Sequence, residues 1–133
     1  DIRVNMYSFT RPEVAKRLTA LRNAGCWVDV VFTEANDAVL AALGNNIQLT
    51  KCNFNIGPGL DVRTHNKYML IDGAYDDDIV PRVYTGSHNF AISALRQADE
   101  TLLRVMGRDL HDEYLRDFWH VRDTCRARGG AIR

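Results

Sequence analysis

Apolar and polar residues alternate over residues 2–6, and this period of two predicts a β-strand near the start of the chain. Residues 10–25 change to helical spacing, with a capping box formed by Thr10 and Glu13, a proline in the first turn and a glycine at the end. The β-branched and aromatic run over residues 27–32 then predicts a buried central strand. A strand, a helix and a second strand in this order predict a right-handed crossover between parallel strands.

The remaining pattern predicts three more helices and four more strands. Asn36 or Asp37 caps a short helix, and Asp109 caps a long one whose aromatic stripe belongs to the core. We expect one α/β domain over residues 1–133, with a mixed, largely parallel β-sheet flanked by helices on both faces. The expected helices cover residues 36–44, 91–97 and 109–125, and the expected strands cover residues 47–54, 62–71, 82–85 and 101–106.

Composition indicates an ordinary soluble globular domain, since 46% of the 133 residues are hydrophobic and 26% are charged. The 17 lysines and arginines balance 17 aspartates and glutamates, so no global basic field attracts a nucleic acid, although a nucleic acid stays open as a substrate. The longest apolar runs are too short to span a bilayer, and no secretory leader pattern opens the sequence. Because the chain begins directly on a strand, we interpret it as a segment of a longer protein.

Neither the cysteines nor the acidic residues form a familiar metal motif. Cys26, Cys52 and Cys125 are odd in number and lack Cys-x-x-Cys spacing, so we interpret them as small buried residues. A bridge between Cys26 and Cys52 stays open for an exported protein. The aspartates at 76–78 suggest calcium, but without the glycine and glutamate of an EF-hand loop a solvated loop tip is favoured. We therefore expect no metal site.

A histidine and a lysine two residues apart form the first candidate functional pair. On the expected strand 62–71, His65 and Lys67 point to one face, while Asn66 and Tyr68 point to the other. An imidazole can act as a nucleophile or proton donor, and an ammonium beside it supplies a fixed positive charge for an anion such as a phosphodiester. The pair therefore indicates phosphoryl chemistry.

Neutral donors and carboxylates follow this pair in the sequence. Ser87 and Asn89 lie two apart after Gly86, which lets the backbone approach a ligand. The helix expected just after them would direct its N-terminal amides at the same anion. Asp99 and Glu100 supply carboxylates that could fix the tautomer of a histidine, and the strand after them is expected to bring Glu100 near the centre of the sheet.

The order and spacing of these residues resemble the HKD motif of the phospholipase D superfamily. Eight fixed residues in one order are far more specific than a lone glycine-rich loop, and the resemblance covers the full domain. The link between Asp72 and Gly86 is longer than is usual in the family. The resemblance places Asp72 with His65, Lys67 and Glu100 among the catalytic residues, although in that family this aspartate generally has a structural or charge-pairing role. The matching residues are His65-x-Lys67-x-x-x-x-Asp72-Gly73, Gly86-Ser87-x-Asn89 and Glu100.

The resemblance implies a two-step phosphodiester transfer. His65 would attack phosphorus to give a phosphohistidine, or protonate the leaving oxygen, while a second histidine takes the complementary part. Lys67, Ser87 and Asn89 would bind the phosphoryl oxygens. Glu100 would accept a hydrogen bond from the protonated nitrogen of His65. No metal or other cofactor is required, because histidines and lysines supply the charge that a divalent ion provides elsewhere.

The family builds one site from two copies of the motif, and this chain carries one. The second HKD motif would come either from a missing N-terminal half or from a homodimer mate. We favour the first, because residues 83–90 and 98–100 resemble the C-terminal half of secreted bacterial phospholipase D-like proteins. An extracellular location follows from that resemblance alone.

Three functions stay open at this point. The favoured one is a phospholipase D-like phosphodiesterase or phosphatidyltransferase acting on phospholipid headgroups. The second is a superfamily nuclease that acts on DNA or RNA as a homodimer, which the neutral net charge disfavours. The third is a non-catalytic binding domain, against which the intact motif argues.

Overall fold

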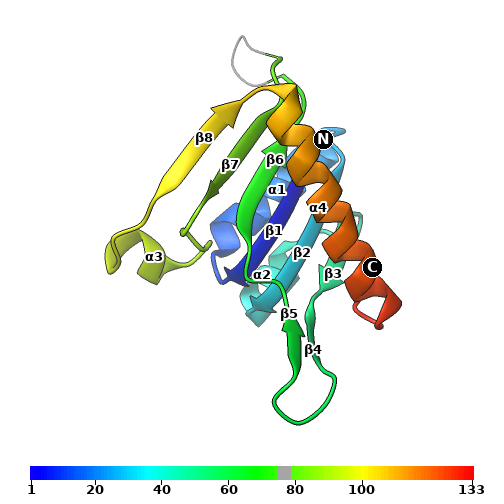
Figure 1. The fold of residues 1–133 in the computed structure, drawn as a ribbon. Helices are drawn as coiled ribbons and strands as arrows, with labels where there is room; N and C mark the ends of the chain where they lie inside the picture. Colours follow the sequence, from blue (N-terminus) through cyan, green and yellow to red (C-terminus); the bar gives the residue numbers. More distant parts are fainter. Residues whose placement is uncertain (75–78) are drawn as a thin grey trace.

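The computed structural model describes residues 1–74 and 79–133, and it arranges four helices and eight strands of that part of the chain around one main sheet (Figure 1). A separate two-stranded hairpin extends from one end of the sheet. The elements are β1 (Ile2–Phe9), α1 (Pro12–Asn23), β2 (Val28–Ala35), α2 (Asp37–Ala42), β3 (Gln48–Lys51), β4 (Asn53–Asn55), β5 (Asp61–Arg63), β6 (Lys67–Ile71), β7 (Arg82–Gly86), α3 (Ile92–Arg96), β8 (Leu102–Met106) and α4 (Arg108–Ala127).

The main sheet is mixed and has the strand order β3-β2-β1-β6-β7-β8. Parallel pairing joins β1 to β2 and β2 to β3, where α1 and α2 provide the crossovers. The pairs β1–β6, β6–β7 and β7–β8 are antiparallel. The predicted mixed α/β sheet is confirmed, but its description as largely parallel is wrong, since three of the five pairings in the described sheet are antiparallel.

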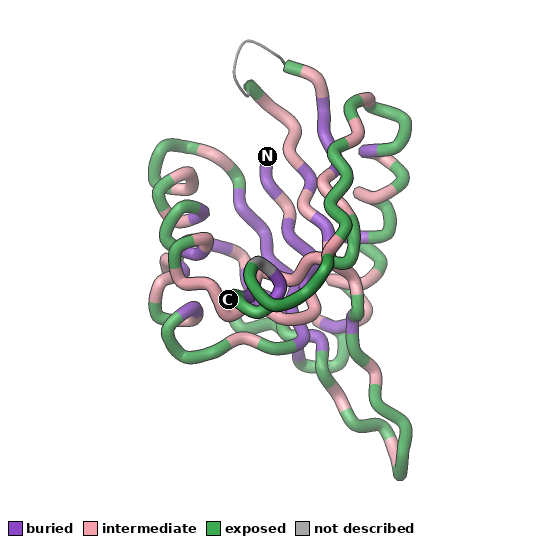
Figure 2. The backbone as a smooth tube through the Cα atoms, turned by 90° about the vertical axis from the view of Figure 1, so that its left-hand side faces the viewer, coloured by how far each residue is buried: buried purple, intermediate pink, exposed green. Residues whose placement is uncertain are grey.

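Helices cover both faces of the sheet, as predicted (Figure 1). The period of two in the strands sends alternate side chains to two separate cores. In the tube view, buried residues gather along the central strands between the flanking helices (Figure 2). The core under α1 and α2 includes Val4, Met6, Val30, Phe32 and Leu49, and the core under α4 includes Val31, Tyr68, Leu70, Val83 and Phe118.

The helix starts agree only in part with the sequence patterns. The predicted capping box of Thr10 and Glu13 does not form, because Arg11 occupies the N-cap of α1. The Glu13 carboxylate instead accepts a hydrogen bond from the Arg11 guanidinium. Asn36 caps α2 as predicted, since its side-chain oxygen accepts a hydrogen bond from a backbone amide of that helix at 2.9 Å. Asp109 lies within the first turn of α4 rather than at its cap.

The strand expected over residues 62–71 is broken by a corner between β5 and β6. Thr64 is buried there, and its hydroxyl donates to the side-chain oxygen of Asn5 at 2.8 Å. Its carbonyl accepts a hydrogen bond from the Thr33 hydroxyl at 2.6 Å. These bonds hold the corner to β1 and β2, and His65 therefore lies just outside the strand that begins at Lys67.

The strand expected over residues 47–54 is also divided, into β3 and β4, at a disulfide-bonded cysteine. Cys52 is bonded to Cys125 near the end of α4, with 5.2 Å between their Cα atoms, and Cys26 is a free thiol. Cys52 and Cys125 are buried as predicted, but the expectation of no disulfide and the alternative bridge between Cys26 and Cys52 are wrong. The disulfide ties α4 to the base of the β4–β5 hairpin, which projects beyond the main sheet (Figures 1 and 2).

The longest helix, α4, has 20 residues, with acidic and basic side chains distributed along it. Within residues 1–74 and 79–133, no helix combines the length and the apolar character needed to cross a membrane. The aspartates at 76–78, considered above for calcium, lie outside the described residues.

Candidate active site

An imidazole, an ammonium and a phenol ring meet at the corner before β6. The Lys67 Nζ lies 3.4 Å from each ring nitrogen of His65 and donates a hydrogen bond to the His65 carbonyl at 2.8 Å. The Tyr7 ring packs against the imidazole with 4.6 Å between centroids, and the same Nζ lies 5.2 Å from the Tyr7 centroid. The two motif residues are thus brought together beside an aromatic ring that the sequence patterns had not singled out.

Asn66 and Tyr68, which lie between and after this pair, direct their side chains toward α4 and fix the backbone. The carbonyl of Asn66 accepts a hydrogen bond from the Tyr7 amide at 2.8 Å, and its side chain donates to Asp117 of α4 at 3.3 Å. The Tyr68 hydroxyl donates to Asp117 at 2.8 Å and accepts from Asn5 at 3.2 Å. Burial raises the pKa of Tyr68, so its hydroxyl keeps its proton as a donor. Asn66 and Tyr68 therefore lock the turn from the α4 side.

Partial burial lowers the pKa of Lys67 below that of an ordinary lysine. The carboxylate of Glu100 acts in the opposite direction and partly restores the charged form. An electrostatic effect of this kind falls off with distance. Glu100 therefore belongs to the same electrostatic environment as Lys67, although the two residues are far apart in the sequence.

Ser87 and Glu100 form a second cluster between the end of β7 and the start of β8. The Ser87 hydroxyl donates to the Glu100 carboxylate and accepts a hydrogen bond from the Thr101 amide at 3.0 Å. A Cβ atom on Gly86 would overlap the backbone of Thr101, so only glycine fits at that position.

The position of Glu100 differs from the prediction in two respects. It precedes β8, which is the edge strand of the described sheet, and not a central strand. In the described part of the chain, its carboxylate contacts the Ser87 hydroxyl and has no hydrogen bond to the His65 ring.

Asn89 is anchored to the end of β1. Its side-chain oxygen accepts a hydrogen bond from the Ser8 amide at 3.0 Å. This bond fixes the orientation of the Asn89 amide, and its side-chain NH₂ group can donate to a ligand. Tyr7 and Ser8 are neighbours on β1, so one strand end holds both the turn at Asn66 and the segment that carries Asn89.

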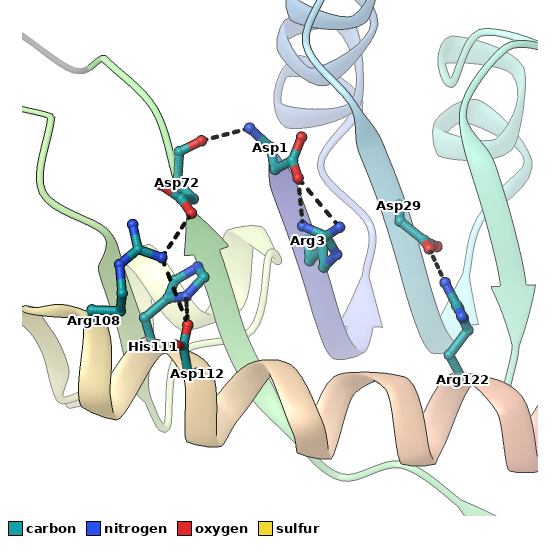
Figure 3. Close-up of polar contacts among 8 residues, drawn as sticks. All are labelled: Asp1, Arg3, Asp29, Asp72, Arg108, His111, Asp112 and Arg122. Atoms are coloured by element: carbon teal, nitrogen blue, oxygen red, sulfur yellow. Dashed lines mark hydrogen bonds and ion pairs between the residues drawn. The ribbon is translucent and has the colours of Figure 1, made fainter.

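Asp72 follows the last residue of β6, where Figure 3 shows it beside Arg108. Lys67 is the first residue of the same strand and therefore lies at its other end. Its carboxylate pairs with Arg108 at 3.4 Å, and its backbone exchanges hydrogen bonds with Asp1. The structure therefore separates Asp72 from the other motif residues. This arrangement agrees with a structural, charge-pairing role for the aspartate.

A groove of about 440 Å³ opens beside His65 and extends toward α4. Its lining changes in character along its length, from basic groups at the corner to carboxylates on the helix. Such a groove can hold a phosphodiester at one end and the alcohol portion of a substrate further along. Among its lining residues are His65 and Lys67 at the corner, Thr85 and Gly86 from β7, and Glu113 and Asp117 from α4.

The sequence patterns missed the residues that support the motif. Tyr7 lies on β1, which the alternation of apolar and polar residues had predicted only as far as residue 6. The Tyr7 hydroxyl donates a hydrogen bond to Glu34 at 3.3 Å. Asn5 is a fully buried polar residue within an apolar strand, and this break in the pattern was the available signal. Within the described residues, no three histidine, cysteine or carboxylate side chains are grouped as metal ligands would be.

Comparison with known proteins identifies the family. The sequence model of the family described as "Cardiolipin synthase, PLD-like domain" matches residues 1–122. The chain belongs to the phospholipase D-like domain family. The resemblance drawn from the HKD motif is thereby confirmed, and the six-stranded mixed sheet is the fold on which this phospholipase D-like domain carries its motif.

Two solved structures resemble this phospholipase D-like domain. Nuc from Salmonella typhimurium, a phospholipase D family member, has a TM-score of 0.70 and 27% sequence identity, and the match covers 93% of this chain and 78% of Nuc. NucT from Helicobacter pylori has a TM-score of 0.74 at 16% identity, with 93% and 79% covered, which shows a common fold. No curated protein sequence matches the chain.

Proposed function

We propose that this chain is a phosphodiesterase that works through a phosphohistidine on His65. A ring nitrogen of His65 attacks phosphorus, the bond to the leaving alcohol breaks, and a second histidine protonates the alcohol oxygen. Water then attacks phosphorus and passes its proton to the second histidine, a phosphorus–oxygen bond forms, and the phosphorus–nitrogen bond breaks to release the His65 ring. The observation that carries this proposal is the contact of the Lys67 ammonium with both ring nitrogens, at 3.4 Å, beside the groove.

The remaining motif residues take binding and positioning parts in this proposal. Lys67 and the NH₂ group of Asn89 bind phosphoryl oxygens, most strongly when negative charge develops on them. Ser87 donates its single hydroxyl hydrogen to a phosphoryl oxygen when the hydroxyl turns away from the Glu100 carboxylate, and Glu100 supports the charge on Lys67. Asp72 acts structurally through its pair with Arg108.

The mechanism needs a second motif. In the first step, one histidine forms the covalent bond while another donates the proton, and a single His65 cannot do both. We propose that a second copy of the chain or another unit with the motif supplies the second histidine. Light scattering combined with specific activity at increasing protein concentration tests this point. Activity that rises as dimer forms supports a second copy, and activity from a strict monomer contradicts the need for a second motif.

We propose a phospholipid as the favoured substrate class. Glu113 and Asp117 also line the groove beside His65. Glu113 is paired with Arg116, but the Asp117 carboxylate accepts from the neutral donors of Asn66 and Tyr68 and would repel a further phosphate of a nucleic acid chain. The balanced charge of the whole chain adds no attraction for a polyanion. A phospholipid presents one phosphodiester to the basic end of the groove. A nuclease activity is the alternative outcome of the test below.

The test compares three kinds of substrate with matched variants. Phosphatidylcholine vesicles, bis(p-nitrophenyl) phosphate, and single- and double-stranded DNA are incubated with wild type, His65→Ala and His120→Ala. We expect cleavage of the two non-nucleic substrates and a loss of about 1000-fold or more in His65→Ala. His120 is exposed on α4 and does not line this groove, although it lines a neighbouring cavity together with His65 and Asn66, and its variant should match wild type. Wild-type activity in His65→Ala contradicts the proposal, and cleavage of DNA alone favours the nuclease.

A further inference from the structure

We infer that Tyr7 is the positioning residue that holds the His65 imidazole and the Lys67 ammonium in register for the reaction. The inference rests on the proposed function, because it assigns a part in that reaction to a residue outside the motif. Tyr7 contacts both groups, with 4.6 Å between its ring centroid and that of His65 and 5.2 Å between its centroid and the Lys67 Nζ. The Tyr7 ring is therefore a shared contact of the imidazole and the ammonium.

The His65 imidazole needs a restraint to keep one orientation. Its side chain is exposed at a corner of the chain, where an imidazole can rotate about both side-chain torsions. A carboxylate partner would fix the ring by occupying one ring nitrogen. The Tyr7 ring instead restrains the imidazole by packing against it at an interplanar angle of 55°. Such a contact limits rotation and does not use a ring nitrogen as a hydrogen-bond partner.

The Tyr7 ring also contacts Lys67. Its ammonium lies near the Tyr7 ring within the range of a cation–π contact, and it has three donors. One donor reaches the His65 carbonyl at 2.8 Å. A cation held by a ring and one carbonyl keeps donors for an incoming phosphoryl oxygen. Tyr7 therefore organises the charge beside the nucleophile and leaves part of its hydrogen-bonding capacity for the substrate.

Tyr7 is itself held by hydrogen bonds from its backbone and from its hydroxyl. Its backbone amide donates to the Asn66 carbonyl at 2.8 Å, which ties it to the residue between His65 and Lys67. At the other end of the side chain, its hydroxyl donates to Glu34 of β2 at 3.3 Å. A ring anchored at both ends is a rigid support. Preorganisation of this kind acts on the rate of the chemical step more than on substrate affinity.

The experiment compares Tyr7→Leu, Tyr7→Phe and Tyr84→Leu in the full chain with bis(p-nitrophenyl) phosphate. Tyr7→Leu should lower kcat on the order of 10- to 100-fold while KM stays within about three-fold. Tyr7→Phe keeps the ring and should recover most of kcat, which separates the ring contact from the Glu34 hydrogen bond. Tyr84 is a half-buried tyrosine of β7 on the same sheet, outside the site, and its leucine variant should match wild type.

A spectroscopic measurement tests the contact without relying on activity. In wild type, proton NMR should detect nuclear Overhauser effects between the Tyr7 and His65 rings, and ring-current shifts of the His65 protons should disappear in Tyr7→Leu. If that variant does not fold, Tyr7→Val and the wild-type spectrum replace it. Wild-type kcat in Tyr7→Leu, or absence of the ring-to-ring effect in wild type, overturns the inference. Full activity of His65→Ala overturns the proposed function instead, so the two failures can be told apart.

Discussion

The Ser87 hydroxyl donates a hydrogen bond to the Glu100 carboxylate and accepts one from the Thr101 amide. Two segments of the motif, one after β7 and one before β8, are therefore joined through a single hydroxyl. This hydrogen bond orients the Glu100 carboxylate toward Ser87. The negative charge of Glu100 also raises the pKa of Lys67. This relationship leads to two predictions about the site.

Removal of the Ser87 hydroxyl should affect catalysis more than folding. Ser87→Ala eliminates a phosphate donor and releases the Glu100 carboxylate, so we expect activity to fall on the order of 10- to 100-fold. The free energy of unfolding should decrease by about 1 kcal/mol, because one exposed hydrogen-bonded hydroxyl is lost. Steady-state kinetics and urea unfolding measure the two effects. Ser93→Ala, in the exposed surface of α3, is the control and should change neither quantity.

The charge of Glu100 should set the alkaline limit of phosphate binding. Lys67 binds phosphate in its protonated form, and partial burial already lowers its pKa, with Glu100 opposing that decrease. Replacing the carboxylate in Glu100→Gln should lower the pKa of Lys67 further. Binding of inorganic phosphate should then be lost at a lower pH than in wild type, as calorimetry across pH would detect. The exposed neighbour Asp99 provides the control, Asp99→Asn, and a shift to higher pH in Glu100→Gln contradicts the prediction.

The ion pair between the buried Asp29 and the half-buried Arg122 should make stability depend on pH (Figure 3). Asp29 is fully buried, and desolvation raises its pKa despite the Arg122 contact at 3.0 Å. A carboxyl with a raised pKa in the folded state stabilises that state most below the ordinary aspartate pKa, and this contribution is lost as the pH rises through the folded-state pKa. Arg122→Gln removes the counter-charge and should reduce the free energy of unfolding by about 3 kcal/mol at pH 7, and by less at pH 4.

Urea unfolding at the two pH values measures this difference. Arg116 provides the matched control, because it pairs with Glu113 on the exposed side of the same helix. Arg116→Gln should change the free energy of unfolding by less than about 0.5 kcal/mol at either pH. Equal losses in Arg122→Gln at pH 4 and pH 7 would show that the buried carboxylate is not the cause.

The disulfide should account for a large part of the stability. Cys52 and Cys125 are 73 residues apart, and a loop of this size restricts the unfolded chain enough to stabilise the fold by about 4 kcal/mol. Reduction should lower the urea midpoint accordingly, while Cys26→Ser should leave it unchanged. Thiol titration of the unfolded, unreduced protein should find one free thiol. Three thiols would contradict the disulfide.

The motif could be predicted from the sequence because its chemistry and its spacing are local. His65 and Lys67 are two residues apart, and the short connection between them keeps them together even though a corner replaces the expected strand. The two cores could also be predicted, since a period of two assigns alternate residues of β1 and β2 to opposite faces.

The neighbours of each strand could not be predicted in the same way. Periodicity fixes the faces of β6 and β8, but it does not say that β6 joins β1 antiparallel or that β8 lies at the edge. The partner of Cys52 depends on where α4 ends over the sheet, which is a property of the whole fold. Tyr7 was missed for the same reason, because its contact with His65 joins residues 58 positions apart through the pairing of β1 with β6.

The amides of Tyr7 and Ser8 hold Asn66 and Asn89 respectively, so successive peptide units of β1 each support a different half of the motif. An odd number of residues deleted within this strand would reverse the parity of its later side chains and uncouple both halves in a single event. Deletion of an even number of residues would keep each later side chain on its face of the sheet but would shorten β1. Evolutionary or engineered length changes in this phospholipase D-like domain should therefore avoid β1 and concentrate in connections such as the tip of the β4–β5 hairpin.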